Sequence, residues 1–216
     1  GGMKTRARRD GSDWILNGTK LWITNGTVAD VAVVWAKTDG DAKSIRGFLV
    51  EKGMPGFEAR AIEGKVSLRA SHTAELSFHD VRVPDENVLP NVAGLRGPLM
   101  CLNQARYGIA WGATGAHRAV FEAARDYALS RIQFGRPIAS FQLVQKKLAD
   151  MYTELVKAQL INWRLGQLKD LDKADFVQIS FAKRNNVRVA LEAARTAREI
   201  LGANGITDDY PVIRHM

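Results

Sequence analysis

The sequence has one cysteine, four scattered histidines and no long apolar run. One cysteine excludes an internal disulfide and argues against a zinc cluster, and no histidine pair shares a helix face, so no metal site is expected. No segment approaches the roughly 20 apolar residues that cross a bilayer. The first residues lack the apolar core of a secretory signal. Neither a nucleophile elbow, a Walker loop nor a Gly-x-Gly-x-x-Gly fingerprint is present.

The cysteine, Cys101, is flanked by Leu99, Met100 and Leu102. Apolar neighbours favour a buried structural thiol over a nucleophile. We therefore expect Cys101 to be buried, in a protein from a reducing compartment.

The net charge of +8 is unevenly distributed. Residues 1–92 carry 13 basic and 12 acidic side chains, whereas residues 93–216 carry 18 and 11. The basic residues alternate with acids, as in Arg125-Asp126 and Lys169-Asp170. This pattern is typical of solvated helix faces, so it argues against nucleic-acid binding.

The first half has the pattern of β-structure. Asn17-Gly18 is a hairpin signal, followed by expected strands at 21–24, 31–36, 46–51 and 76–84. A polar turn is expected at 38–42. Short strands at this spacing predict a small antiparallel sandwich or open-barrel domain over residues 1–92.

The second half has helical periodicity. Helices are expected over about 97–131, from Ser140 onward, and over 174–201, with an N-cap near 170–172 and a C-cap at Gly202. Long helices joined by short links predict a bundle over residues 93–216. The fold class is therefore α+β, with an antiparallel β domain followed by a helical bundle.

Three segments carry a resemblance to a known family: residues 20–25 (KLWITN), 131–138 (RIQFGRPI) and 199–206 (EILGANGI). Each resembles a flavin-contacting segment of the acyl-CoA dehydrogenase family, in the family's order. Residues 103–112 (NQARYGIAWG) and 145–151 (QKKLADM) look like its glutaryl-CoA branch, and the similarity runs essentially from end to end.

The resemblance implies that FAD is the cofactor. An indole can form a flat wall against the flavin, a hydroxyl can reach a ring heteroatom, and a permanent cation suits a diphosphate. The cofactor-binding residues it implies are Trp22, Ile23, Thr24, Arg131, Phe134, Gln142, Glu199, Ile200, Leu201, Gly202 and Ala203.

The resemblance also implies an acyl-CoA site. Arg106 occupies the position near the acyl thioester, and Ser71 is expected to touch the CoA portion. The substrate-lining residues it implies are Ser71, Leu99, Met100, Cys101, Leu102, Asn103, Gln104, Ala105 and Arg106.

In the family a glutamate removes the α-proton of the acyl thioester, and the flavin is then reduced. Glutaryl-CoA members also release CO2, which yields crotonyl-CoA, and an electron-transfer flavoprotein reoxidises the flavin. The base is expected about ten residues beyond Met216, and Ala105 stands where isovaleryl-type relatives place theirs. We expect the N-terminal helical domain, with its glutaryl-recognising residues, also to be missing. The 216-residue chain is therefore predicted to be inactive.

The resemblance further implies a homo-oligomer, in this family commonly a tetramer, in which neighbouring copies share each FAD site. The expected compartment is the cytoplasm of a bacterium or the mitochondrial matrix of a eukaryote. A non-catalytic acyl-CoA-binding or helical interaction scaffold is the alternative function. Flavin colour would distinguish the two.

Overall fold

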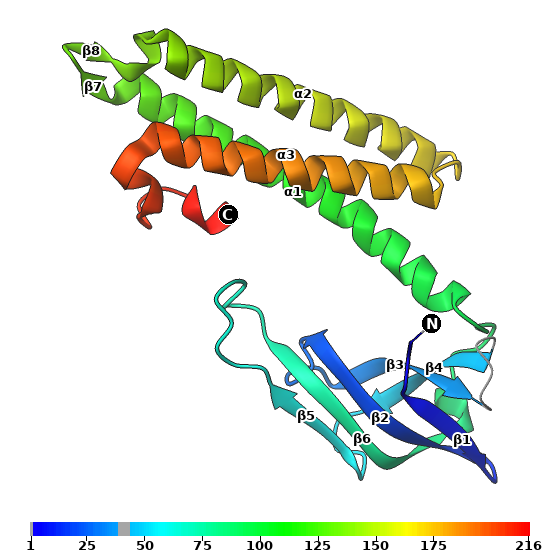
Figure 1. The fold of residues 1–216 in the computed structure, drawn as a ribbon. Helices are drawn as coiled ribbons and strands as arrows, with labels where there is room; N and C mark the ends of the chain where they lie inside the picture. Colours follow the sequence, from blue (N-terminus) through cyan, green and yellow to red (C-terminus); the bar gives the residue numbers. More distant parts are fainter. Residues whose placement is uncertain (1, 39–43) are drawn as a thin grey trace. The chain divides into compact units, whose positions relative to one another are not determined.

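The computed structural model describes residues 2–38 and 44–216, which divide into two compact units between Cys101 and Leu102 (Figure 1). The turn expected at 38–42 falls almost wholly outside the described residues. The domain boundary expected at residues 92 and 93 stays a prediction.

The first unit is built on one six-stranded sheet with strand order β4-β3-β1-β2-β6-β5. Its strands are β1 (Arg6–Asp10), β2 (Asp13–Thr24), β3 (Val31–Thr38), β4 (Ile45–Glu51), β5 (Phe57–Ala61) and β6 (Thr73–Pro84), and a short 3-10 turn, η2 (Asp85–Asn87), follows β6. Neighbouring strands are antiparallel except β1 and β3, which pair in parallel because β2 lies between them in the chain. The expected α+β class is confirmed, with a mixed sheet in place of a purely antiparallel one.

The hairpin expected at Asn17-Gly18 is wrong. Strand β2 continues through both residues, and its register against β6 shifts there at a bulge. Gly18 has a φ of +135°, and a Cβ on it would lie 2.8 Å from the Thr5 Cα. The glycine therefore serves a close approach of two backbones, and the true hairpin lies at Gly11, between β1 and β2.

Aromatic and branched side chains from one face of the sheet form the core of this unit. Trp14 meets Phe48 edge to face at 5.6 Å between ring centroids, and Phe57 stacks on Phe78 at 5.3 Å. Leu16 is fully buried among them. This packing anchors β2 and β6, the strands that carry the predicted flavin segment and the chain leading from Ser71.

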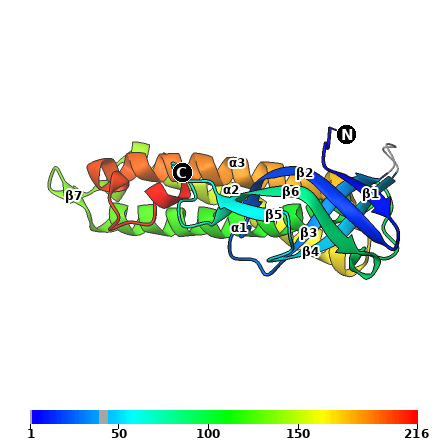
Figure 2. The same ribbon diagram turned by 90° about the horizontal axis from the view of Figure 1, so that it is seen from below.

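The second unit is a three-helix arrangement with a short hairpin at one end. Its elements are α1 (Arg96–Ser130), β7 (Ile132–Gln133), β8 (Arg136–Pro137), η3 (Ile138–Ser140), α2 (Gln142–Asp170), α3 (Phe176–Leu201), η4 (Gly202–Ile206) and η5 (Ile213–His215), and α1 begins before the unit boundary. Helices α2 and α3 run alongside each other in both views, and buried residues of α1 between Ala110 and Ala128 pack against them (Figures 1 and 2). The helical segments expected from periodicity are thus confirmed.

The ends of α3 show one correct and one wrong expectation. The helix ends at Gly202, as predicted, with φ at +61°. The N-cap expected near 170–172 is wrong, because α3 begins at Phe176. Asp175 caps it, and its carboxylate accepts hydrogen bonds from the backbone amides of Val177 and Gln178 while the Gln178 side chain completes a capping box.

A buried polar network crosses the three helices. Asn186 of α3 donates to Asn162 Oδ1 of α2 at 2.8 Å, and Asn162 donates to Thr114 Oγ1 of α1 at 2.9 Å. Both asparagines also reach the Ala110 carbonyl oxygen, and both are fully buried. Because these polar groups satisfy one another only in one register, the network fixes how the helices align.

Within the described residues, no helix is both long and apolar enough to cross a membrane.

Candidate functional site

Trp22 stands at an irregular point of strand β2. The register of β2 against β6 shifts between Lys20 and Ile23, and Trp22 has a φ of +62°, a left-handed conformation that is rare for a bulky side chain. Its indole is 67% exposed. Strained backbone persists only where the surrounding structure enforces it, which is characteristic of binding sites. The bulge thus presents a flat apolar ring to solvent.

The residues after Trp22 hold it at the end of the strand. Ile23 is half-buried and packs on the sheet core, whereas Thr24 is exposed and pairs in register with Thr73. The next amide, of Asn25, donates to the His72 carbonyl at 2.8 Å. Trp22 and Thr24 therefore form a short exposed stretch anchored on both sides.

A second exposed aromatic ring lies at the tip of the β7–β8 hairpin. Phe134 and Gly135 both have positive φ, at +53° and +75°, as the two central residues of a type I′ turn require. Phe134 is 92% exposed, and its ring lies 6.1 Å from that of Phe141, edge to face. The guanidinium of Arg136 covers Phe141 at 4.4 Å from the ring centroid.

A groove of about 470 Å³ lies beside this hairpin. Four predicted cofactor residues line it: Phe134, Gln142, Glu199 and Ile200. Lys147 also lines it and donates to Glu199 Oε2 at 2.8 Å. That hydrogen bond holds the pKa of Glu199 below its usual range, so the carboxylate is charged and neutralised by its partner.

Arg131 begins the chain that leads into the hairpin. Its backbone carbonyl accepts from the Ile138 amide at 2.9 Å, which closes the base of the hairpin. The side chain is exposed, and its guanidinium makes no ion pair within the described ranges. An unpaired permanent cation is available to bind an anion.

The predicted residues at the end of α3 divide into core and surface. Ile200 and Leu201 are 7% and 2% exposed and belong to the core of the bundle. Gly202 and Ala203 are exposed in the turn that follows. Two residues on, Gly205 is so close to Arg198 that an added Cβ would lie 2.6 Å from its carbonyl oxygen. The turn therefore offers backbone, not side chains, to a ligand.

Ser71 lines a pocket of about 310 Å³ in the sheet unit. Lys65 lines the same pocket and donates to the Ser71 carbonyl and to Thr73 Oγ1, both at 2.6 Å. Arg69 adds a second cation. The carboxylate of Glu63 lines the pocket as well, so two cations and one anion face it, and one of the cations holds its own loop together. No motif in the sequence predicted that Lys65 belongs to a binding site.

The predicted substrate residues on α1 are largely exposed: Leu99, Met100, Cys101, Leu102, Gln104 and Ala105. Asn103 and Arg106 are half-buried, and Arg106 donates to Asn103 Oδ1 at 3.2 Å. The expectation of a buried Cys101 is wrong, because its thiol is exposed. Apolar neighbours in a helix do not determine which face of the helix is covered.

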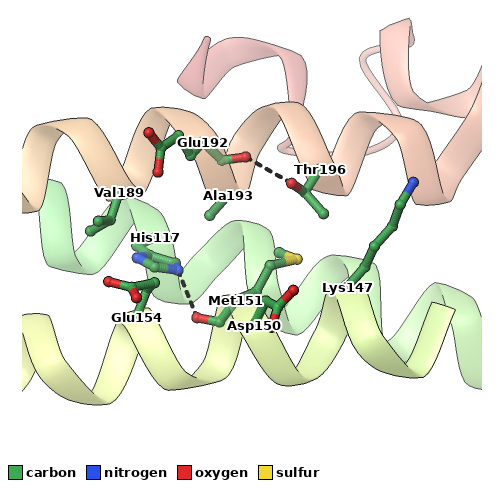
Figure 3. A pocket seen from close by; sticks show the side chains of 9 residues that line it. All are labelled: His117, Lys147, Asp150, Met151, Glu154, Val189, Glu192, Ala193 and Thr196. Atoms are coloured by element: carbon green, nitrogen blue, oxygen red, sulfur yellow. Dashed lines mark hydrogen bonds between the residues drawn. The ribbon is translucent and has the colours of Figure 1, made fainter. Parts of the chain in front are cut away.

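A pocket of about 200 Å³ lies among the helices, at residues that no sequence motif indicated (Figure 3). Fully buried His117 hydrogen-bonds the Met151 carbonyl at 3.0 Å through Nε2, which makes Nδ1 a bare acceptor in the neutral ring. Nδ1 has no partner among the described residues. Burial lowers the pKa of the imidazole.

Carboxylates around this pocket already have partners. Lys146 pairs with Asp150, Lys157 with Glu154 and Arg188 with Glu192. The described part of the chain contains no group of three or more His, Cys, Asp or Glu that could hold a metal ion. The pocket is therefore a packing feature beside the buried His117.

Comparison with known proteins identifies the family. The family model described as the acyl-CoA dehydrogenase C-terminal domain matches residues 93–216, and the middle-domain model matches residues 1–81. The chain belongs to the acyl-CoA dehydrogenase family. It is 38% identical to the human short-chain specific acyl-CoA dehydrogenase over 218 residues, covering all of this chain and 53% of that protein.

Solved structures of acyl-CoA dehydrogenases are also similar. The glutaryl-CoA dehydrogenase of Mycobacterium smegmatis is 57% identical with a TM-score of 0.96, over 99% of this chain and 55% of that one. A structure from the same organism, described as a glutaryl-CoA dehydrogenase in complex with FADH2, is 53% identical with a TM-score of 0.95, over 99% and 55% of the two chains. The chain spans about half the length of the relatives it matches.

Acyl-CoA dehydrogenases use FAD, and the residues present fit such a group. The sheet unit offers the exposed indole of Trp22 beside the hydroxyl of Thr24. The helical unit offers the exposed ring of Phe134, the groove with Gln142, and the unpaired cation of Arg131. The structure thus brings the predicted cofactor residues together in two groups, one in each unit.

Proposed function

We propose that this protein is an FAD-dependent acyl-CoA dehydrogenase that oxidises and decarboxylates glutaryl-CoA to crotonyl-CoA and passes electrons to an electron-transfer flavoprotein. The observation that carries the proposal is the exposed, conformationally strained Trp22 within a chain of this family. The choice of glutaryl-CoA is supported by a higher identity to a glutaryl-CoA dehydrogenase than to the short-chain enzyme.

In this proposal the sheet unit supplies a wall for the cofactor. When bound, FAD accepts the two electrons removed from the acyl group. Trp22 presents its indole face to the ring system, and its left-handed backbone keeps the side chain out of the sheet core. Thr24 offers a hydroxyl to a ring heteroatom, and half-buried Ile23 fixes the spacing between the two.

The helical unit holds the polar part of the cofactor. Arg131 neutralises a diphosphate oxygen, since no carboxylate of the described chain competes for it. Gln142, Phe134 and the Lys147–Glu199 pair line the groove beside the hairpin. Backbone amides near Gly202 and Ala203 approach the adenosine or a phosphate, because no bulky side chain stands there.

The acyl-CoA is proposed to lie along residues 99–106 of α1, with Arg106 near the thioester and Ser71 near the CoA portion. Exposed Leu99, Met100 and Leu102 provide an apolar surface for the acyl chain. No glutamate or aspartate occurs between residues 99 and 106, and alanine at 105 cannot transfer a proton. The 216-residue chain by itself is therefore proposed not to turn over glutaryl-CoA.

The assembly and compartment are also proposals. Two groups of cofactor residues suit a site that is completed by a neighbouring copy, which favours a homotetramer. The cytoplasm of a bacterium or the mitochondrial matrix of a eukaryote would supply the acyl-CoA and the electron-transfer flavoprotein.

The test is a substrate comparison with protein expressed from the complete gene. Glutaryl-CoA is expected to bleach the flavin absorbance faster than butyryl-CoA and to release CO2 together with crotonyl-CoA. Bleaching by butyryl-CoA alone would replace glutaryl-CoA with a short-chain substrate. Flavin reduction by the isolated 216-residue chain would show that a base lies within it after all.

A pair of variants separates the role of the indole from folding. Trp22→Ala removes the wall, whereas Trp22→Phe keeps an aromatic ring. Because the side chain is exposed, both variants are expected to have the same midpoint of urea unfolding as the wild-type protein. Only Trp22→Ala is expected to lose FAD affinity, by about tenfold if a stacking contact near 1.4 kcal/mol is lost. Equal FAD affinity of all three proteins would contradict the assignment.

The alternative is a non-catalytic acyl-CoA-binding or helical interaction scaffold. It is favoured by an apolar groove of about 660 Å³ between α2 and α3, which exposes Leu160, Val177 and Phe181. A colourless protein from the complete gene that takes up no added FAD would support this alternative.

A further inference from the structure

A pocket of about 300 Å³ in the sheet unit contains a lysine in unusual surroundings. Ala32, Val34, Trp35 and Leu76 form apolar walls, and Lys20 is the single titratable group among the described residues that line it. The pocket thus combines one basic nitrogen with space for a short hydrocarbon chain.

The ammonium of Lys20 has no compensating partner. Within the described ranges, Lys20 makes no ion pair and no side-chain hydrogen bond. The side chain is half-buried, and this burial lowers the pKa of the amine. Lys65 and Lys147, by contrast, donate to oxygens at 2.6–2.8 Å. Lys20 therefore has a larger neutral, nucleophilic fraction than a solvated lysine near neutral pH.

We propose that Lys20 is a site of N-acylation by short-chain acyl thioesters. The lone pair of Nζ attacks the thioester carbonyl carbon, a C–N bond forms and the C–S bond breaks. The departing thiolate takes up the proton released by the nitrogen, so the products are an amide and a free thiol. The step needs no oxidant or reductant, and the thioester is its sole co-reactant.

The pocket favours both the reaction and its product. Apolar walls accept the hydrocarbon chain of the acyl group, which brings the carbonyl to Nζ. The amide that forms is uncharged, so acylation removes the cost of keeping an ammonium in an apolar site. Lys20 lies two residues before Trp22 at the bulge of β2. Acylation would therefore remove a positive charge beside the proposed flavin wall, although the inference itself does not depend on redox activity.

The experiment compares acylation at Lys20 with acylation at exposed Lys52 in the same folded protein. Purified protein is incubated at pH 7.5 with the butyryl thioester of N-acetylcysteamine, a probe without the nucleotide of CoA. Peptide mass spectrometry then gives the initial rate at each lysine. Burial lowers the pKa of Lys20 and so raises its neutral fraction, and the apolar walls hold the acyl chain beside Nζ, so Lys20 should be acylated faster than Lys52. An equal or slower rate at Lys20 overturns the proposal.

Two controls test whether the pocket is responsible. Replacing the butyryl probe with the acetyl probe should slow Lys20 more than Lys52, because the shorter chain contacts less of the apolar wall. In urea that unfolds the protein, the two lysines should react at similar rates. The role of the pocket is overturned if the ratio of the butyryl rate to the acetyl rate is the same at Lys20 and Lys52. It is also overturned if Lys20 still reacts faster than Lys52 in the unfolded protein.

Discussion

Removing the central amide of the buried polar network should strongly destabilise the helical unit. Asn186 Nδ2 shares its two N–H groups among Asn162 Oδ1 at 2.8 Å and two further acceptors, Thr114 Oγ1 and the Ala110 carbonyl, both at 3.2 Å. Asn186→Ala deletes about two net hydrogen bonds, worth about 2 kcal/mol. It also strands Asn162 Oδ1, which costs about 1–3 kcal/mol more because it is buried. The free energy of unfolding should fall by about 3–5 kcal/mol.

Urea unfolding followed by far-ultraviolet circular dichroism measures this change, because the helices dominate that signal. The matched control is Asn185→Ala, the preceding residue on α3. Asn185 is half-buried and makes a single peripheral hydrogen bond, to Asn186 Oδ1 at 3.2 Å. This control strands Asn186 Oδ1 but keeps the hydrogen bonds that join the three helices, so it should cost about 1–3 kcal/mol, less than Asn186→Ala. The reasoning is refuted if the two variants are destabilised equally, or if Asn186→Ala costs less than about 1 kcal/mol.

Further predictions concern His117 and two glycines. Burial lowers the pKa of His117, so below the ordinary value near 6.5 the unfolded state binds more protons than the folded state. Stability should therefore fall as the pH drops below about 6.5, and His117→Gln should remove this part of the pH dependence; parallel profiles would contradict it. Gly18→Ala should destabilise the sheet unit by about 1–3 kcal/mol because its φ is +135° and Thr5 leaves no room for a Cβ. Gly112→Ala, in an open stretch of α1, should instead stabilise by about 0.5–1 kcal/mol in the same urea titration. A neutral Gly18→Ala would show that the bulge can relax.

The long elements could be predicted because their signals repeat along the chain. Helices expected over 97–131 and 174–201 were found at Arg96–Ser130 and Phe176–Leu201, since apolar periodicity over seven turns or more leaves little ambiguity. Local signals did worse. Asn17-Gly18 has the composition of a hairpin turn, yet the glycine is required by contact with Thr5, which is distant in sequence. Similarly, Asp175 caps α3 with help from Gln178, although an acidic pair precedes it at 170–172.

The candidate site was named largely from family resemblance, and its physical character came from the structure. Nothing in KLWITN indicates that Trp22 has a positive φ, because strand propensity would place an aromatic residue in the regular ladder. Exposure of Cys101 and burial of His117 both depend on which helix face is covered, and this is a property of the assembled bundle. The unpaired state of Lys20 likewise depends on long-range packing against β3 and β6.

The central claim is that Trp22, Thr24, Arg131 and the groove beside Phe134 hold FAD. The most direct measurement is the visible absorbance of the protein purified from its complete gene, before and after addition of glutaryl-CoA. The account predicts a yellow protein whose flavin bands bleach with the substrate. A folded but colourless protein that takes up no added FAD would contradict it.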